Sequence, residues 1–192
     1  MESTIHDNKN NNKMGFSTKF IVTVVVALVS NAFFAQSAFD KYDGQEGVSS
    51  IIVNKKMFQM MASVKVDAND KETQQYLSLM KKLDNLKVFT TTTAKLSADM
   101  KLSADKYMNT AGLEELMRVN DSGKNVRIWV KSGSTDSQVK ELLMLIEEGS
   151  KGNETVLMSL TGDFDLNEIA VLTDKMRIPG GDALKKATKG KK

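Results

Sequence analysis

The sequence predicts a single α+β domain of two layers, in which a mostly antiparallel sheet carries its helices on one face. Two observations lead to this prediction. Segments with helical periodicity and segments rich in β-branched residues interleave through the first half, and three strand-like segments then follow one another with short turns between them. Consecutive strands joined by short turns pair as an antiparallel meander, and helices then bury one of its faces. The expected order is βααβαβββα.

The first half of the domain begins with a strand and two helices. Residues 48–53 are rich in Ile and Val, which is typical of a strand. Asn54 is placed to cap a short helix over residues 55–61. After a linker at residues 64–69, residues 70–84 carry apolar side chains at helical spacing and predict a second helix.

A strand and a long helix come next. Residues 86–93 are aromatic and β-branched, which favours a strand. Residues 94–119 predict a helix that is broken or bent near residues 109–112. Within it, Leu-Ser-Ala-Asp occurs twice, starting at Leu96 and at Leu102. Six residues turn a helix by about 600°, so the copies face different directions, and we expect their Ser and Asp side chains to be solvated.

The second half predicts three strands and a final helix. Residues 125–131 alternate between apolar and polar side chains, as in a half-buried strand. Residues 139–148 form a continuous apolar run that periodicity alone does not assign to helix or strand, and its length and its place between two strands favour a strand. Residues 154–161 predict another strand. A helix over residues 165–176 ends before Pro-Gly-Gly at 179–181.

The first 37 residues have the pattern of an export signal. Residues 20–35 contain no charged side chain, and Lys19 precedes them. A signal peptide has a positive start, an apolar core and an exit of small residues, here ending at Ser37. We therefore predict cleavage near Ser37 or Ala38, which leaves a mature domain over residues 38–179.

Two alternatives concern this leader. Met14 is a second candidate for the start, because the segment before it is long and mixed in charge for a signal. An uncleaved anchor is the other alternative, although a spanning helix needs about 20 apolar residues and this run is shorter. A cleaved signal places the protein in the periplasm or outside the cell.

The net charge of +3 is concentrated outside the predicted domain. Residues 180–192 hold five lysines and one acid, while residues 38–179 hold 19 basic and 21 acidic residues. A nucleic-acid-binding domain needs clustered Lys and Arg on its folded surface, so we expect no nucleic-acid partner. We expect the Lys-rich tail to be disordered. Membrane contact is expected only through the leader, or weakly through this tail.

The residue types present exclude several kinds of chemistry. The chain has no Cys, and its one His is His6, within the leader. Nucleophilic triads that use His or Cys and His-ligated metal sites are therefore excluded from the mature chain. No Gly-rich nucleotide-binding motif occurs. We expect no cofactor and no enzymatic activity. Paired-carboxylate hydrolysis of envelope glycan is the alternative.

One acidic cluster is a weak candidate for a metal site. Asp163, Asp165 and Asn167 occupy positions 1, 3 and 5 of a calcium-loop pattern. Position 6 of that pattern requires Gly, and Glu168 stands there instead. The favoured interpretation is a helix start, in which Asp165 and Glu168 form a capping box.

Four apolar side chains are candidates for partner contact. Met57, Met60 and Met61 are neighbours on one short helix, and Met-rich faces either fill irregular cores or adapt to binding partners. Trp129 points away from the face of Ile128. Either it is exposed on the sheet as a contact residue, or it packs beneath a helix with only its indole N–H in contact with water.

Four segments of the chain, in order, resemble a known family. They are residues 39–61, 112–131, 139–148 and 154–172, and they are similar to the domain of unknown function 4252 family of small proteins exported by Gram-negative bacteria. The resemblance spans Phe39 to Leu172. It implies an exported protein without an established activity. We therefore expect a non-catalytic accessory module of the cell envelope that binds another envelope protein.

Overall fold

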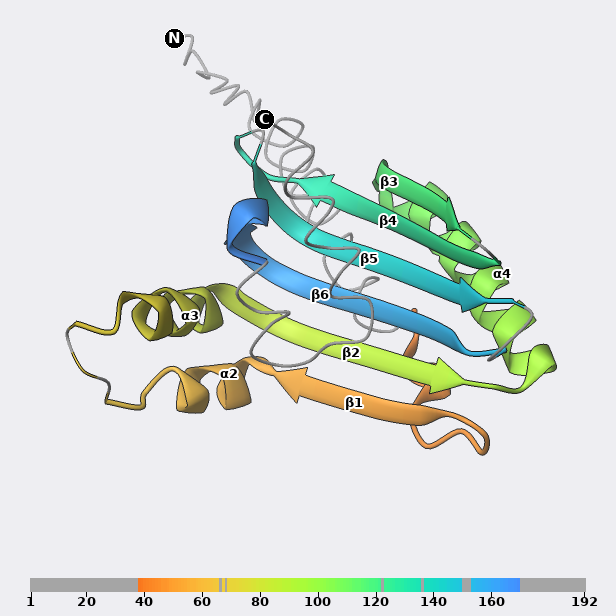
Figure 1. The fold of residues 1–192 in the computed structure, drawn as a ribbon, viewed down its shortest axis with the longest axis horizontal. Helices are drawn as coiled ribbons and strands as arrows, with labels where there is room; N and C mark the ends of the chain where they lie inside the picture. Colours follow the sequence, from red (N-terminus) through yellow and green to blue (C-terminus); the bar gives the residue numbers. More distant parts are fainter. Residues whose placement is uncertain are drawn as a thin grey trace, which may run out of the picture. The chain divides into compact units, whose positions relative to one another are not determined.

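Six antiparallel strands form one sheet in the order β1-β2-β6-β5-β4-β3 (Figure 1). The computed structural model describes residues 38–65, 67, 69–121, 123–135, 137–149 and 153–169. The chain divides between Ser37 and Ala38 into two units, and every described residue belongs to the second. The predicted leader, the tail and most of the helix expected over 165–176 lie outside the described residues. No helix among those described is long and apolar enough to cross a membrane.

The α+β class and the antiparallel sheet are confirmed. The strands are β1 (Ser49–Asn54), β2 (Leu83–Thr91), β3 (Glu114–Asp121), β4 (Lys124–Ser132), β5 (Gln138–Glu148) and β6 (Thr155–Asp165). The helices are α2 (Lys55–Met61), α3 (Lys71–Lys82) and α4 (Ala94–Ala111), with the short 3-10 helices η1 (Asp40–Tyr42) and η2 (Leu166–Glu168). The ambiguous apolar run at 139–148 is therefore a strand.

Two helices begin at capping side chains, and the sequence predicts the first of these caps, Asn54. The side chain of Asn54 accepts a hydrogen bond of 3.0 Å from the backbone N–H of Met57 at the start of α2. The side chain of Asp70 accepts one of 3.0 Å from Thr73 at the start of α3. Each cap satisfies a backbone donor that the helix itself cannot pair.

The central strands are apolar on both faces. Ile128, Met144 and Met158 lie opposite one another on one face, together with the side chains of Phe58 and Leu79 from α2 and α3 in a single hydrophobic core. The residues that alternate with these along each strand point to the other face of the sheet, where α4 packs. We expected helices on one face, and the structure has helical elements against both. The reason lies in the continuous apolar run of β5, because a strand buried on both sides does not alternate.

The long helix expected over residues 94–119 ends at Ala111, and residues 114–121 are strand β3 instead. Gly112 adopts the left-handed conformation, with φ 67° and ψ 42°, and its N–H donates to the carbonyl of Met108. This is the usual glycine end of a helix. The following Glu-Glu-Leu-Met-Arg has helical propensity, but pairing with β4 overrides it.

We predict that Gly112→Ala destabilises the domain by about 1–2 kcal/mol, because a Cβ is disfavoured in the left-handed conformation. Urea unfolding monitored by circular dichroism measures the change. Gly112→Asn is the matched control, since Asn tolerates this conformation and should cost less. An Ala variant as stable as the wild type would contradict this account of how α4 ends.

Candidate functional site

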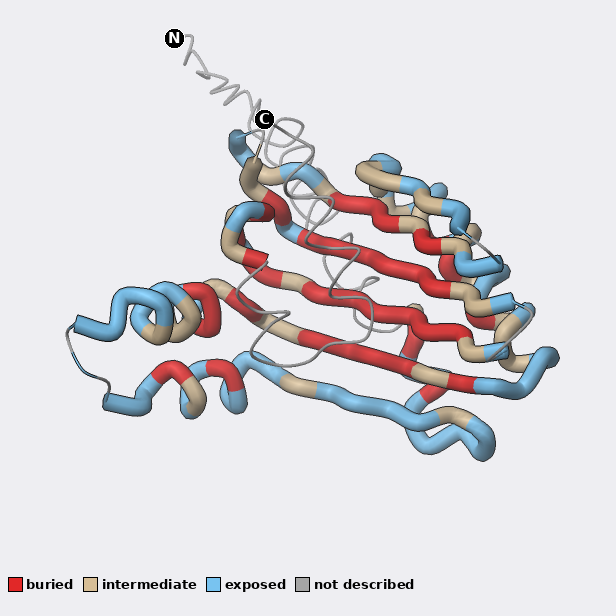
Figure 2. Tube along the Cα trace, viewed as in Figure 1, coloured by how far each residue is buried: buried red, intermediate tan, exposed pale blue. Residues whose placement is uncertain are grey.

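Strand β1 is an exposed, uncharged edge of the sheet. Its sequence, Ser-Ser-Ile-Ile-Val-Asn, contains no charge and no Pro, and the pairing with β2 has no bulge. Ile51 is 55% exposed and Ile52 is 42% exposed. Figure 2 shows β1 as an exposed strand beside the buried β2 and β6. An edge of this kind presents unpaired backbone groups to any extended segment that approaches.

The opposite edge of the sheet is protected. Strand β3 carries Glu114, Glu115, Arg118 and Asp121, and Glu115 and Arg118 form an ion pair of 2.5 Å. A bulge interrupts its register with β4 after Glu115. Charges and bulges are the usual means by which proteins block edge-to-edge association. The two edges of the sheet therefore differ in their readiness to accept another strand.

The short helix α2 extends the exposed apolar region beyond β1. Met57 is 50% exposed and Met60 is 61% exposed, whereas Phe58 is fully buried and fixes the helix to the core. Met61 is partly buried and packs against the same core. Of the three methionines singled out in the sequence, two are therefore on the surface and one belongs to the core. Ile51, Ile52, Met57 and Met60 are called the β1–α2 surface below.

Trp129 is not a surface residue. It is 1% exposed, on the face of the sheet that packs against α4, with the guanidinium of Arg127 4.9 Å from its ring centroid. The packed alternative is therefore the one found, and Trp129 is unavailable as a contact residue. The expectation that its indole N–H stays in contact with water was wrong, because this N–H is buried and has no hydrogen-bond partner within the described residues.

Polar side chains of α4 fasten this helix to the sheet and to η1. Ser97 and Asp105, from the two Leu-Ser-Ala-Asp copies, contact Thr155 at 2.6 Å and Arg127 at 3.0 Å. The hydroxyl of Tyr42 donates a hydrogen bond of 2.8 Å to the carboxylate of Asp99 and accepts one of 2.9 Å from the hydroxyl of Ser103. The expectation that these Ser and Asp side chains are merely solvated was wrong. Both copies contribute to these contacts, and Asp99 of the first copy and Ser103 of the second meet the same Tyr42 hydroxyl.

A buried carboxyl group lies under the C-terminal half of α4. Glu141 is 4% exposed and accepts a hydrogen bond of 2.9 Å from the hydroxyl of Tyr107. Burial raises the pKa of Glu141, and the hydrogen bond from Tyr107 and the charge of Lys131 offset this only in part. Burial likewise raises the pKa of Tyr107, so this hydroxyl stays protonated and remains a donor.

The acidic cluster at the end of β6 has the geometry of a helix cap. Asp165 accepts from the backbone N–H of Asn167 at 2.8 Å, and Glu168 accepts in return from the backbone N–H of Asp165. The predicted capping box is confirmed. Asp163 instead forms an ion pair of 2.6 Å with Lys140. Within the described part of the chain, no three acidic or His side chains converge as metal ligands.

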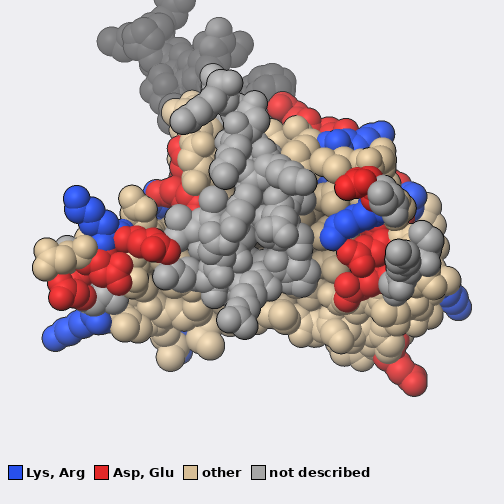
Figure 3. All heavy atoms as spheres, viewed as in Figure 1, with Lys and Arg blue, Asp and Glu red and all other residues tan. Residues whose placement is uncertain are grey.

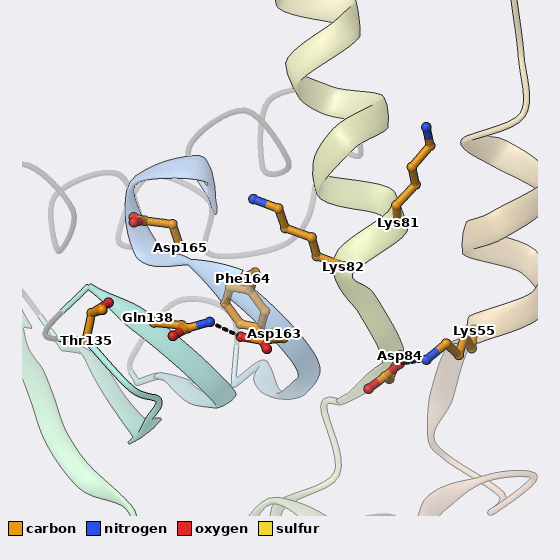
Figure 4. Close-up of a pocket in the computed structure, with 9 residues that line it drawn as sticks. All are labelled: Lys55, Lys81, Lys82, Asp84, Thr135, Gln138, Asp163, Phe164 and Asp165. Carbon is orange, nitrogen blue, oxygen red and sulfur yellow. Dashed lines mark hydrogen bonds and ion pairs between the residues drawn. The ribbon is translucent and has the colours of Figure 1, made fainter.

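An open cleft of about 630 Å³ lies where α3 meets β2 and β6 (Figure 4). Its lining consists of nine residues from these elements and their neighbours: Lys55, Lys81, Lys82, Asp84, Thr135, Gln138, Asp163, Phe164 and Asp165. Asp84 pairs with Lys55 at 2.7 Å, a contact visible in Figure 4. Lys82 pairs with Glu168 at 2.7 Å.

The carboxylates of this cleft are poor candidates for acid catalysis. The hydrogen bond from Lys140 lowers the pKa of Asp163. Burial acts to raise the pKa of Asp165, but hydrogen bonds from Ser137 and Asn167 outweigh it, and the net shift is downward. Glycoside hydrolysis needs one carboxyl group with a raised pKa beside a second carboxylate. Glu141 has such a raised pKa, but it does not line the cleft.

Comparison with known protein families identifies the family of this chain. The family model described as Domain of unknown function (DUF4252) matches residues 42–172. The chain belongs to this family. The match confirms the resemblance found in the sequence and spans the DUF4252 domain from the end of η1 through every strand of the sheet. No match was found among curated proteins or among solved structures.

We predict that Glu141→Gln makes this DUF4252 domain less sensitive to rising pH. The stability that Glu141 contributes is fully present below the pKa it has in the unfolded chain and is lost as the pH rises through its raised folded pKa. The stability of the Gln variant relative to the wild type should therefore increase from pH 4 to pH 7, measured by urea unfolding.

Asp163→Asn is the control for this prediction, because its pKa is shifted the other way. The contribution of Asp163 is present above its unfolded pKa and is lost as the pH falls through the lowered folded pKa. Its Asn variant should lose stability relative to the wild type as the pH rises. Equal pH trends for the two variants would contradict the assignment of Glu141.

Proposed function

We propose that this protein is a non-catalytic accessory module of the cell envelope that binds another envelope protein through the β1–α2 surface. The observation that carries the proposal is the exposed, uncharged edge strand β1, continued by the exposed Met57 and Met60 of α2. An edge strand binds an extended segment by adding it to the sheet through main-chain hydrogen bonds. Methionine side chains are flexible and fit partners of irregular shape.

The contrast between this surface and the cleft favours a binding role over hydrolysis. In the cleft, Asp84 and Asp163 form ion pairs with lysines and Asp165 caps η2. The β1–α2 surface has the opposite character, since four large apolar side chains lie exposed on consecutive elements. Ile51 and Ile52 point to opposite faces of the sheet, so these side chains surround its edge. Exposed apolar side chains at one edge are typical of protein interaction sites.

We propose further that the module works in the periplasm or outside the cell, after removal of residues 1–37. The uncharged run at 20–35 and the small residues up to Ser37 support this. The division of the chain between Ser37 and Ala38 falls at the same point as the expected cleavage.

We predict that the protein recovered from fractionated cells has an intact mass that begins near Ala38 and is found in a soluble envelope or culture fraction. Intact-mass spectrometry of each fraction measures this. A mass that retains residues 20–35, in the membrane fraction, would show that the leader is an anchor. The binding surface would then belong to a tethered module.

We predict that a photo-crosslinking amino acid at Met57 captures a protein partner in intact cells. The same probe at Leu102 is the matched control, because Leu102 is 68% exposed but belongs to α4, outside the surface. Adding Ile52→Lys should lower the Met57 crosslink roughly tenfold or more, because an interface that buries an unpaired charge is strongly weakened. Unfolding in urea checks that the variant is folded.

Equal crosslinking from Met57 and Leu102 would contradict a specific surface at β1 and α2. A Met57 crosslink that Ile52→Lys leaves unchanged would exclude β1 from the interface and restrict the contact to α2.

A further inference from the structure

The structure points to one occupant for the β1 edge. This inference rests on the proposed function of that same surface and identifies the protein that the edge binds as a second copy of the chain. We propose that β1 pairs antiparallel with β1 of a second copy of the chain, so that the two six-stranded sheets become one continuous sheet. A closed two-copy assembly of this kind uses the same strand from both molecules. Three features of β1 and its flanks support it.

The side chains of β1 are self-complementary in one register. A two-fold axis perpendicular to the sheet at Ile52 places Ile52 opposite Ile52 of the second copy. In the same register, Ile51 lies opposite Val53, and Ser50 lies opposite Asn54. Apolar side chains thus meet apolar ones and polar meet polar, which is the pairing that stabilises neighbouring strands. An axis at Ile51 would instead place Ser50 opposite Ile52 and Ser49 opposite Val53.

The same register continues the faces of the sheet across the junction. Ile51 and Val53 pair with Val88 and Leu86 of β2, so they lie on the face of the main hydrophobic core. Ile51 is 55% exposed because no strand lies beyond it. In the pair of sheets, Ile51 of each copy would be flanked by Val53 of the other. The apolar face would therefore extend across both edges.

The charges at the two ends of β1 are opposite. Glu46 precedes the strand and Lys56 follows it in α2, both are exposed, and neither forms an ion pair within the described residues. Antiparallel pairing brings the beginning of one strand beside the end of the other, so the end that carries Glu46 lies beside the end that carries Lys56 at two equivalent places. Figure 3 shows a mostly uncharged lower margin, where β1 lies, with an acidic group at its right end.

Sedimentation of the processed protein, purified from the cell envelope, tests the assembly. We expect a reversible dimer. Glu46→Lys and Lys56→Glu should each weaken it about tenfold, since each change acts at two equivalent contacts of modest strength. The double variant, Glu46→Lys with Lys56→Glu, should restore it. Lys106→Glu, at an exposed lysine of α4, is the control and should have no effect.

Cysteine crosslinking tests the register, because the natural chain has no Cys. Ile52→Cys should form an intermolecular disulfide under mild oxidation, because each Cys lies opposite the same Cys of the second copy of the chain. Ile51→Cys should form an intermolecular disulfide much more slowly, because the same Cys of the second copy lies diagonally across the strand pair, about 7–8 Å away. Leu102→Cys measures random collisions. Faster crosslinking at Ile51 than at Ile52 would overturn the proposed register.

The outcomes separate this inference from the proposed function. A dimer that crosslinks through Ile52→Cys and responds to the charge exchange supports the inference. A protein that stays monomeric at every concentration, while the probe at Met57 captures a different envelope protein, overturns the inference and leaves the function standing. A monomer without a Met57 crosslink overturns both.

Discussion

Burial of both faces of the central strands is the constraint on which this structure depends. Strands β5 and β6 are almost entirely buried, and their pairing joins the two halves of the sheet. Because neither face of these strands can meet water, helical elements are needed on both sides. Both faces of these strands are therefore covered by packing within the domain. Only the edges of the sheet have backbone groups that are free to accept a partner.

The two faces are held in different ways. The face of Ile128 and Met144 is apolar and joins α2 and α3 in one hydrophobic core. The face under α4 mixes apolar side chains with hydrogen-bonded polar ones, such as Ser97 with Thr155 and Tyr107 with Glu141. Buried polar pairs are costly unless satisfied, so they specify one placement of the helix. Side chains from both Leu-Ser-Ala-Asp copies take part in this placement.

The contrast between the two edges is what supports the proposed binding role. β3 combines charges with a bulge, as expected of an edge that must stay single, whereas β1 has neither. β1 is also followed directly by a helix with exposed methionines. An accessory module needs such a surface and no reactive group. That need is consistent with a cleft whose carboxylates are paired or serve as a cap.

The sequence alone determined the α+β class, five of the six strands, the caps at Asn54 and Asp165, and the family. These features depend on local patterns, because periodicity and capping act over a few residues. Only the tertiary structure decided that residues 114–121 form a strand, since their helical propensity is overridden by pairing with β4. Tertiary contacts also decided that Trp129 is buried while Met57 and Met60 are exposed. Exposure depends on which distant segments pack against a residue, and local sequence does not contain that information.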